Sequence, residues 1–84
     1  MHRSSKLELE ALGVRVRAAR EAANFSVTDL AARLGVQRAS IAEWETGGRA
    51  MDALELRDFC RAVGASSDYL LFGPGSRALG KNSS

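Results

Sequence analysis

Residues 27–46, VTDLAARLGVQRASIAEWET, decide the fold of this chain of 84 residues. The apolar side chains in this stretch fall into two groups at helical spacing. Leu30 and Leu34 are one helical turn apart and share a face. Ile41 and Trp44 are three residues apart and share a face on a second segment. The spacing predicts two short amphipathic helices.

Two small residues determine how these helices meet. Gly35 lies between them and can take the left-handed backbone conformation that a tight turn needs. Ala31 has a minimal side chain, so the second helix can cross close over the first. Helices joined in this way form a helix-turn-helix, whose second helix can enter the major groove of DNA.

Length and composition narrow the classes of protein to which the chain can belong. With 84 residues, 45% of them hydrophobic, it can form one small domain, whose marginal core would gain from self-association. No run approaches the ~20 apolar residues of a membrane span, and the N-terminus lacks the apolar stretch of a signal peptide. The single cysteine, Cys60, cannot form an internal disulfide. We therefore expect a cytoplasmic protein.

The kind of basic residue is more informative than the net charge of +2, which is small for a nucleic-acid binder. Ten of the twelve basic residues are arginine, the side chain suited to phosphate and guanine. The positive excess falls in residues 1–51, where eight basic residues meet six acidic ones. Taken alone, this pattern also fits ordinary solvated helix faces.

The N-terminal third of the chain predicts one long helix, from about residue 6 to residue 23. Ser5 and Glu8 have the spacing of a capping box at its start. Gly13 weakens such a helix by up to ~1 kcal/mol relative to alanine. The ordered part is therefore expected to begin either after Ser5 or near Gly13.

Two further helices follow the helix-turn-helix, whose own helices are expected over 27–34 and 37–45. A polar residue can cap the start of each, and a glycine can end it. The residues in these positions are Asp52 and Gly64 for the fourth helix and Ser66 and Gly73 for the fifth. Residues 74–84 are rich in Gly and Ser, and we expect a flexible tail. No strand pattern appears, so the predicted fold is all-α with five helices.

Four segments, LGVRVRAARE, VTDLAARLGV, IAEWETG and VGASSDYLLFG, resemble the lambda-repressor-like helix-turn-helix family of Cro and XRE-type regulators. The resemblance covers residues 12–73 and implies a five-helix DNA-binding domain there. Residues 1–11 would form an N-terminal arm or helix extension. The implied function is that of a sequence-specific transcriptional regulator, a repressor that binds a twofold-symmetric operator as a homodimer.

The resemblance also implies an ion pair within the domain. In the family, an arginine late in the first helix pairs with the glutamate that ends the recognition helix, and Arg20 and Glu45 match these positions. A carboxylate at a helix C-terminus opposes the helix dipole and is stabilised by a cation. We therefore expect Arg20 and Glu45 to hold the recognition helix against the first helix.

The family contacts base edges from the first turn of the recognition helix and from a position four or five residues later. The matching residues here are Gln37, Arg38, Ala39 and Glu43. Arg38 suits a guanine, Gln37 an adenine or a phosphate, and Ala39 a thymine methyl. Glu43 can accept from a cytosine amino group but repels phosphates. Alternatively, Glu43 is solvated or paired with Arg38.

Other residues are expected to contact the DNA backbone or a second subunit. The expected phosphate contacts are Arg15 or Arg17, Thr28, Ser40 and Arg49. The expected dimer contact is the apolar closing segment of Tyr69, Leu70, Leu71 and Phe72. Part of this segment must also enter the core. An arm carrying His2, Arg3 and Lys6 is an alternative to a disordered start.

The sequence argues against an enzyme and against a bound metal or cofactor. One histidine, His2, and one cysteine, Cys60, cannot make a structural zinc site. The Gly47–Gly48 pair lacks the lysine of a phosphate-binding loop. The expected partners are therefore double-stranded DNA and a second copy of the chain, with no membrane.

Two alternative functions remain open. One is an antitoxin-type regulator that also binds a toxin partner, and the other is a protein-interaction module that retains the fold without binding DNA. Val27 stands where the family commonly has a glutamine that contacts the DNA backbone, and Met51 where it commonly has a proline. The modest net charge, Val27, Ala39 and Glu43 favour the interaction module, whereas Arg38 and the predominance of arginine among the basic residues favour DNA. The chain is either complete or the N-terminal part of a longer regulator.

Overall fold

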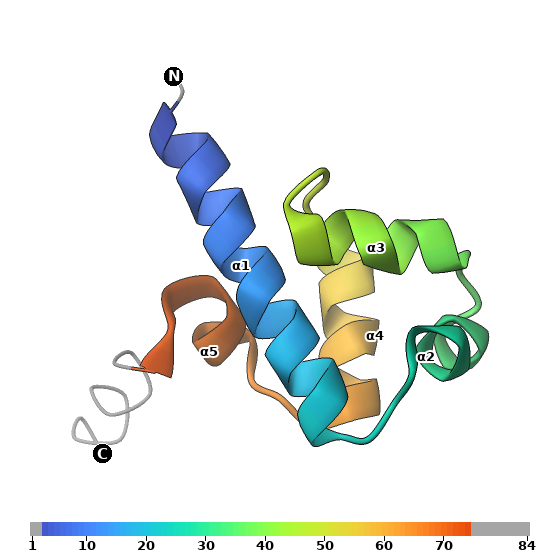
Figure 1. Ribbon diagram of the computed structural model, residues 1–84. Helices are drawn as coiled ribbons and strands as arrows, with labels where there is room; N and C mark the ends of the chain where they lie inside the picture. Colours follow the sequence, from blue (N-terminus) through green and yellow to red (C-terminus); the bar gives the residue numbers. More distant parts are fainter. Residues whose placement is uncertain (1–2, 75–84) are drawn as a thin grey trace, which may run out of the picture.

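Five α-helices make up residues 3–74, the part of the chain that the computed structural model describes. The helices are α1 (Arg3–Ala22), α2 (Val27–Leu34), α3 (Arg38–Thr46), α4 (Ala53–Val63) and α5 (Ser67–Phe72). In Figure 1, α1 crosses the molecule diagonally, with α5 on one side of it and α2 and α3 on the other. The predicted all-α, five-helix fold is confirmed over these residues. Residues 75–84 of the expected tail and His2 of the expected arm lie outside the described residues.

Side-chain hydrogen bonds cap the starts of α2, α4 and α5, and the caps of α4 and α5 are the residues that the sequence predicts. The hydroxyl of Ser26 accepts a hydrogen bond from the amide of Asp29 at the start of α2, over 3.0 Å. Asp52 accepts from the amide of Glu55 at the start of α4, over 2.7 Å, and the amide of Asp52 donates to the carboxylate of Glu55 over 2.9 Å. Ser66 caps α5 in the same way as Ser26 caps α2. Each cap satisfies an amide that the first helical turn leaves unpaired.

The start of α1 differs from the prediction. The helix begins at Arg3 and continues through Gly13 without a break. Ser5 therefore lies inside the helix, so the expected capping box of Ser5 with Glu8 is wrong. The alternative start near Gly13 is also wrong, because tertiary packing of this glycine outweighs its low helix propensity.

The turn between α2 and α3 has the geometry that the sequence predicts. Gly35 adopts the left-handed conformation, with φ 72° and ψ 31°. The amide of Val36 donates to the carbonyl of Ala31 over 3.0 Å, which closes the end of α2. Ala31 itself is buried, and α2 and α3 pack against each other there.

A single core joins all five helices. The buried apolar side chains come in small numbers from each helix: Val16 and Ala19 of α1, Leu30 and Ala31 of α2, Ile41 and Trp44 of α3, Phe59 of α4 and Leu70 of α5. The rings of Trp44 and Phe59 meet edge to face, with centroids 6.5 Å apart. Because α3 contributes two of these residues, its inner face is fixed by the core and its outer face is left to solvent.

Candidate nucleic-acid interface

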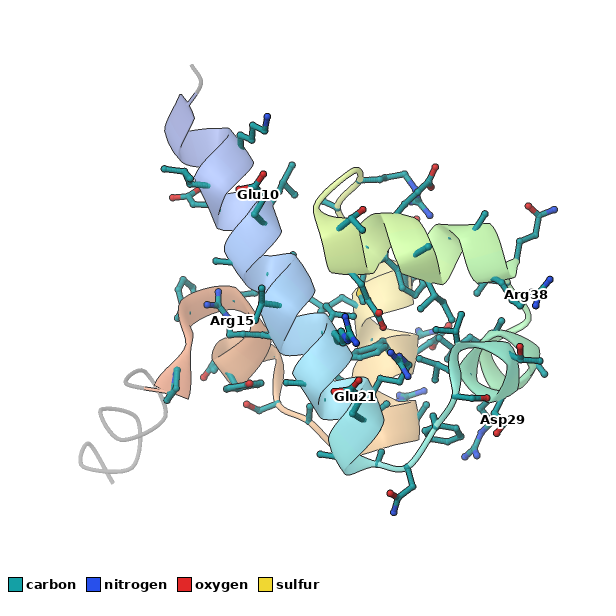
Figure 2. All side chains as sticks on the ribbon, viewed as in Figure 1. Glu10, Arg15, Glu21, Asp29 and Arg38 are labelled. Carbon is teal, nitrogen blue, oxygen red and sulfur yellow. The ribbon has the colours of Figure 1, made fainter. Side chains whose placement is uncertain are left out.

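The outer face of α3 carries all four residues expected to contact DNA bases. Ile41 and Trp44 point into the core, at 0% and 2% exposure. The exposed residues of this helix and its cap are Gln37, Arg38, Ala39, Ala42, Glu43 and Thr46. Four of them, Arg38, Ala39, Ala42 and Glu43, recur at i, i+1, i+4 and i+5, which is the spacing of one helical face. Figure 2 shows Arg38 projecting from the end of α3 that lies next to α2.

The N-terminus of α3 presents backbone donors together with these side chains. Gln37 is the N-cap residue and has an extended backbone, with φ −80° and ψ 151°. Its side chain makes no capping hydrogen bond to the first turn. In the first turn, the amide of Ser40 donates to the carbonyl of Gln37 over 3.0 Å. The remaining first-turn amides have no side-chain cap and can bind an anion from outside, where the helix dipole also favours negative charge.

Arg20 and Glu45 anchor the opposite end of α3 to α1. The Nε of Arg20 donates to Oε2 of Glu45 over 2.6 Å, and its Nη2 donates to Oε1 over 3.3 Å. The Nη1 of Arg20 donates to the carbonyl of Phe25 over 2.9 Å, in the segment that leads into α2. The two side chains are only 10% and 11% exposed. The hydrogen bond to Glu45 is the main cause that raises the pKa of Arg20 above its usual value.

Two glycines allow α1 and α3 to approach each other closely at this anchored end. A Cβ atom on Gly13 would lie 2.7 Å from the carbonyl oxygen of Trp44. Gly47, which ends α3 with φ 83°, packs against the backbone of Glu10. Larger residues would push the two backbones apart. From the sequence alone, Gly13 is only a weak point of the helix, because the neighbours that require a glycine there are 31 or more residues away.

Arg49 lies in the loop after α3 and is held by two carboxylates. Its Nε is 3.3 Å from Oε1 of Glu43, and its Nη1 is 3.2 Å from Oε1 of Glu55. The guanidinium carbon also lies 5.8 Å from the centre of the Trp44 ring. The hydrogen bond to Glu55 is the main cause that raises the pKa of Arg49, and the hydrogen bond to Glu43 is the next largest. We refer to Glu43, Arg49 and Glu55 as the Arg49 cluster.

The Arg49 cluster changes the expected roles of two residues. Glu43 pairs with Arg49, not with Arg38, the alternative partner considered from the sequence. Arg49 is expected as a phosphate contact, but two carboxylates of its own chain partly neutralise its charge. Its side chain is still 42% exposed. No regular spacing relates a loop arginine to these two helix residues, so the sequence pattern contained no signal for the cluster.

Arg15, another expected phosphate contact, binds the end of α5. Its Nε donates to the carbonyl of Leu70 over 2.8 Å, and its Nη2 donates to that of Leu71 over 3.3 Å. These bonds satisfy carbonyls that the C-terminal turn of a helix leaves without partners. Figure 2 shows Arg15 beside α5, at a distance from Arg38. The structure therefore gives Arg15 a role in holding α5 to α1.

The remaining expected phosphate contacts are more accessible. Arg17 is exposed on α1, where its Nε lies 3.1 Å from a carboxylate oxygen of Glu21. Thr28 is exposed in the first turn of α2, and Ser40 is half-buried in the first turn of α3. Such polar groups at helix N-termini commonly contact the DNA backbone.

The closing segment divides between the core and the surface. Leu70 is fully buried within its own chain, so the expectation that it lies at a dimer contact is wrong. Tyr69 is half-buried and packs against the same core. Leu71 and Phe72 are 46% and 69% exposed. Only these last two residues offer much surface to a partner.

The described residues form neither a metal-ligand cluster nor a membrane-spanning helix. Between residues 3 and 74, no three His, Cys, Asp or Glu side chains are grouped as metal ligands would be. No helix in this part of the chain combines the length and the apolar character needed to cross a bilayer.

Comparison with known proteins identifies the family. A family model described as a helix-turn-helix domain matches residues 11–70. The P22 c2 repressor, solved in complex with a synthetic operator, is 30% identical, with a TM-score of 0.70 over 75% of this chain and 96% of that chain. Among curated proteins, no significant sequence match is found.

ClgR, the clp gene regulator of Corynebacterium glutamicum, is similar in two solved structures. In one it is 30% identical with a TM-score of 0.70, covering 76% of this chain and 82% of that chain. In the other it is 31% identical with a TM-score of 0.71, covering 88% of this chain and 80% of that chain. The family match spans most of the chain, and the five-helix arrangement agrees with these neighbours. The chain therefore belongs to the helix-turn-helix family of DNA-binding regulators and has a lambda-repressor-like fold.

Proposed function

We propose that the protein is a sequence-specific transcriptional repressor that binds a twofold-symmetric operator as a homodimer, with residues 12–73 as the DNA-binding domain. The observation that carries this proposal is the division of α3 into two faces. Its inner face is fixed by Ile41 and Trp44 in the core, whereas Arg38 and Ala39 are exposed on the outer face. A helix held in this way can enter the major groove without losing any contact of the fold.

The proposed base contacts follow from the chemistry of the exposed side chains. The guanidinium of Arg38 can bind O6 and N7 of a guanine, and the amide of Gln37 can bind an adenine. The methyl group of Ala39 can contact a thymine methyl. Glu43 can accept from a cytosine amino group, and the adjacent Arg49 reduces the repulsion between its carboxylate and nearby phosphates.

The proposed phosphate contacts come from two sources. The first is the set of backbone amides at the N-terminus of α3, together with Ser40 and the exposed Thr28 of α2. The second is arginine, from Arg17 and from the exposed part of Arg49. These contacts set the position and orientation of α3 on the duplex, while the base contacts determine the sequence that is bound.

A protein-interaction module is the second candidate function. The Arg49 cluster favours it, because two carboxylates face one arginine and leave an excess negative charge beside the recognition helix. A regulator of the antitoxin type would combine both activities, with DNA and a protein partner bound by one chain. Neither candidate includes a catalytic role.

Binding of the full chain to a fluorescently labelled random-sequence duplex, titrated with salt, separates these functions. For a DNA-binding domain, the logarithm of the association constant should fall linearly with the logarithm of the salt concentration, with a slope of about −0.9 for each phosphate contacted. Arg17→Ala should make the slope shallower by about one contact, because Arg17 is a proposed phosphate contact, whereas Arg38→Ala should mainly relax the preference for one base. Absence of binding at low salt would reject the repressor and support the interaction module.

A further inference from the structure

Most of the arginine side chains that the structure describes bind oxygen atoms of the chain itself. These arginines are Arg15, Arg17, Arg20, Arg49 and Arg57. Within the same described residues, the guanidinium groups of Arg33, Arg38 and Arg61 form no hydrogen bond or ion pair, and all three residues are exposed. Arg38 belongs to the proposed DNA interface, whereas Arg33 and Arg61 have no part in it.

Arg33 and Arg61 line the same pocket, which lies between α2 and α4. Its volume is about 230 Å³. The other lining residues are Leu34, Asp58 and Ala62. Leu34 and Ala62 are half-buried and pack against the core, so the pocket places apolar surface beside two guanidinium groups.

The pocket carries an excess of positive charge. Asp58 is its one acidic lining residue, and Oδ1 of this carboxylate already accepts from the Nε of Arg57 over 3.0 Å. The guanidinium carbon of Arg33 lies 6.0 Å from the centre of the Phe25 ring, a contact that occupies no N–H donor. Arg33 and Arg61 each lie in the last turn of a helix, where a cation suits the helix dipole. This position also leaves their N–H donors free, so an anionic ligand would supply the missing acceptors.

The pocket lies behind the recognition helix and not on its outer face. Trp44, on the inner face of α3, packs against Phe59 of α4, and Phe59 is the neighbour of the lining residue Asp58. In Figure 1, α2 and the C-terminal part of α4 lie below α3. A duplex held against the outer face of α3 would therefore leave the pocket open to a different partner.

We propose that this pocket binds an acidic segment of a partner protein, in which a carboxylate lies next to an aliphatic side chain. Two guanidinium groups can hold a carboxylate through paired, charge-assisted hydrogen bonds. Leu34 and Ala62 provide the contact for the aliphatic side chain. A free phosphate ion would leave this apolar surface uncovered, so the mixed lining favours a peptide. The proposal goes beyond the repressor function and requires neither DNA nor a dimer.

Selection from a displayed library of random peptides, with the full chain as the immobilised target, tests the proposal. The wild-type chain should enrich peptides in which glutamate or aspartate stands beside leucine, isoleucine or valine. One enriched peptide is then labelled with fluorescein, and fluorescence anisotropy gives its dissociation constant. Arg33→Gln and Arg61→Gln should each raise this constant about tenfold, because each removes a charged donor. Asp58→Asn should lower it, because it removes the acidic group from the pocket.

Two other arginines provide matched controls. Arg17→Gln removes an exposed arginine of α1, and Arg38→Gln removes one from the proposed DNA interface. Each should change the dissociation constant of the peptide by less than ~2-fold, because exposed charges distant from the pocket are screened by salt. Circular dichroism verifies that every variant is folded.

The outcomes separate this inference from the proposed function. Failure to enrich acidic peptides, or equal affinities of the wild-type, Arg33→Gln and Arg61→Gln chains, would overturn the pocket as a binding site. Loss of the peptide in Arg38→Gln, or its displacement by a saturating duplex, would also overturn it, because the peptide would then occupy the DNA interface. If the peptide binds as expected but no duplex binds the chain, the pocket is supported and the repressor function fails.

Discussion

Arg20 and Glu45 join the last turn of α1 to the last turn of α3 through a hydrogen bond of 2.6 Å between Nε and Oε2. Both side chains are about nine-tenths buried. The pair neutralises a carboxylate that would otherwise oppose the dipole of α3 at its C-terminus. Because the same guanidinium also binds the carbonyl of Phe25, it couples α1, α3 and the segment before α2. Together with the core residues of α3, this arginine therefore fixes the orientation of α3.

Arg20→Ala should lower the free energy of unfolding by ~3–5 kcal/mol, because it leaves the Glu45 carboxylate buried without a partner. Urea denaturation followed by the fluorescence of Trp44, the single tryptophan, measures the change. Arg17→Ala is the matched control, since it breaks an exposed pair with Glu21 and should cost less than ~0.5 kcal/mol. Arg20→Lys should fall between wild type and alanine, because it keeps the charge and loses the paired hydrogen bonds. Equal stabilities of Arg20→Ala and Arg17→Ala would contradict the account.

Gly13→Ala should destabilise the protein by about 1–3 kcal/mol, although alanine is the better helix former. The added methyl group would press on the backbone of α3 at Trp44. Gly48→Ala is the control, because a Cβ atom there meets its neighbours at an ordinary 3.7 Å and φ is not positive. Thermal unfolding followed by circular dichroism compares the two. A more stable Gly13→Ala chain would show that α1 and α3 are not in close backbone contact.

Arg49→Ala should weaken binding to all duplexes by a similar factor, roughly tenfold, because it leaves Glu43 and Glu55 unbalanced beside the phosphates. Adding Glu43→Gln to this variant should restore part of the affinity by removing one of the two carboxylates. Arg57→Ala removes an exposed arginine that pairs with Asp58 on α4 and serves as the control. Fluorescence anisotropy with several duplexes measures the affinities. A loss confined to one DNA sequence would mean that Arg49 acts on base recognition.

Cys60 should react with iodoacetamide more slowly in the folded chain than in urea near pH 8. Burial raises the pKa of its thiol, and the thiolate is the reactive form. The same shift favours the neutral thiol in the folded state. The neutral thiol therefore contributes its full share of stability below the pKa of the unfolded state, about 8.5, and this share is lost as the pH rises through the pKa of the folded state. Cys60→Ala should remove this alkaline loss of stability. Equal alkylation rates in the folded and unfolded chains would show that the fold does not protect the half-buried thiol.

The starts and ends of α2, α4 and α5 are predictable from sequence because the residues that determine them are local. Ser26, Asp52 and Ser66 bond to amides three residues ahead, and Gly35 and Gly64 take left-handed conformations that other residues avoid. The exposed face of α3 is predictable for a similar reason, since the spacing of its two core residues fixes which side chains remain outside.

Gly13, Arg15 and Arg49 show where local patterns fail. Each contacts a segment that is distant in sequence or lies across a loop. Gly13 packs against the end of α3, Arg15 donates to carbonyls of α5, and Arg49 pairs with two carboxylates. Their residue types fit several roles equally well. Only the packing of the helices decides between an arginine that meets phosphate and one that completes the fold.

Selection of bound duplexes from a random DNA pool, carried out with the wild-type chain and with Arg38→Ala, tests directly whether the outer face of α3 reads DNA. The wild-type chain should enrich two inverted half-sites, centred about 34 Å apart, with a guanine at one position of each. Arg38→Ala should retain the rest of the site and lose that preference, at a cost of ~1–3 kcal/mol. Failure of the wild-type chain to enrich any sequence, or an unchanged preference in Arg38→Ala, would contradict the account.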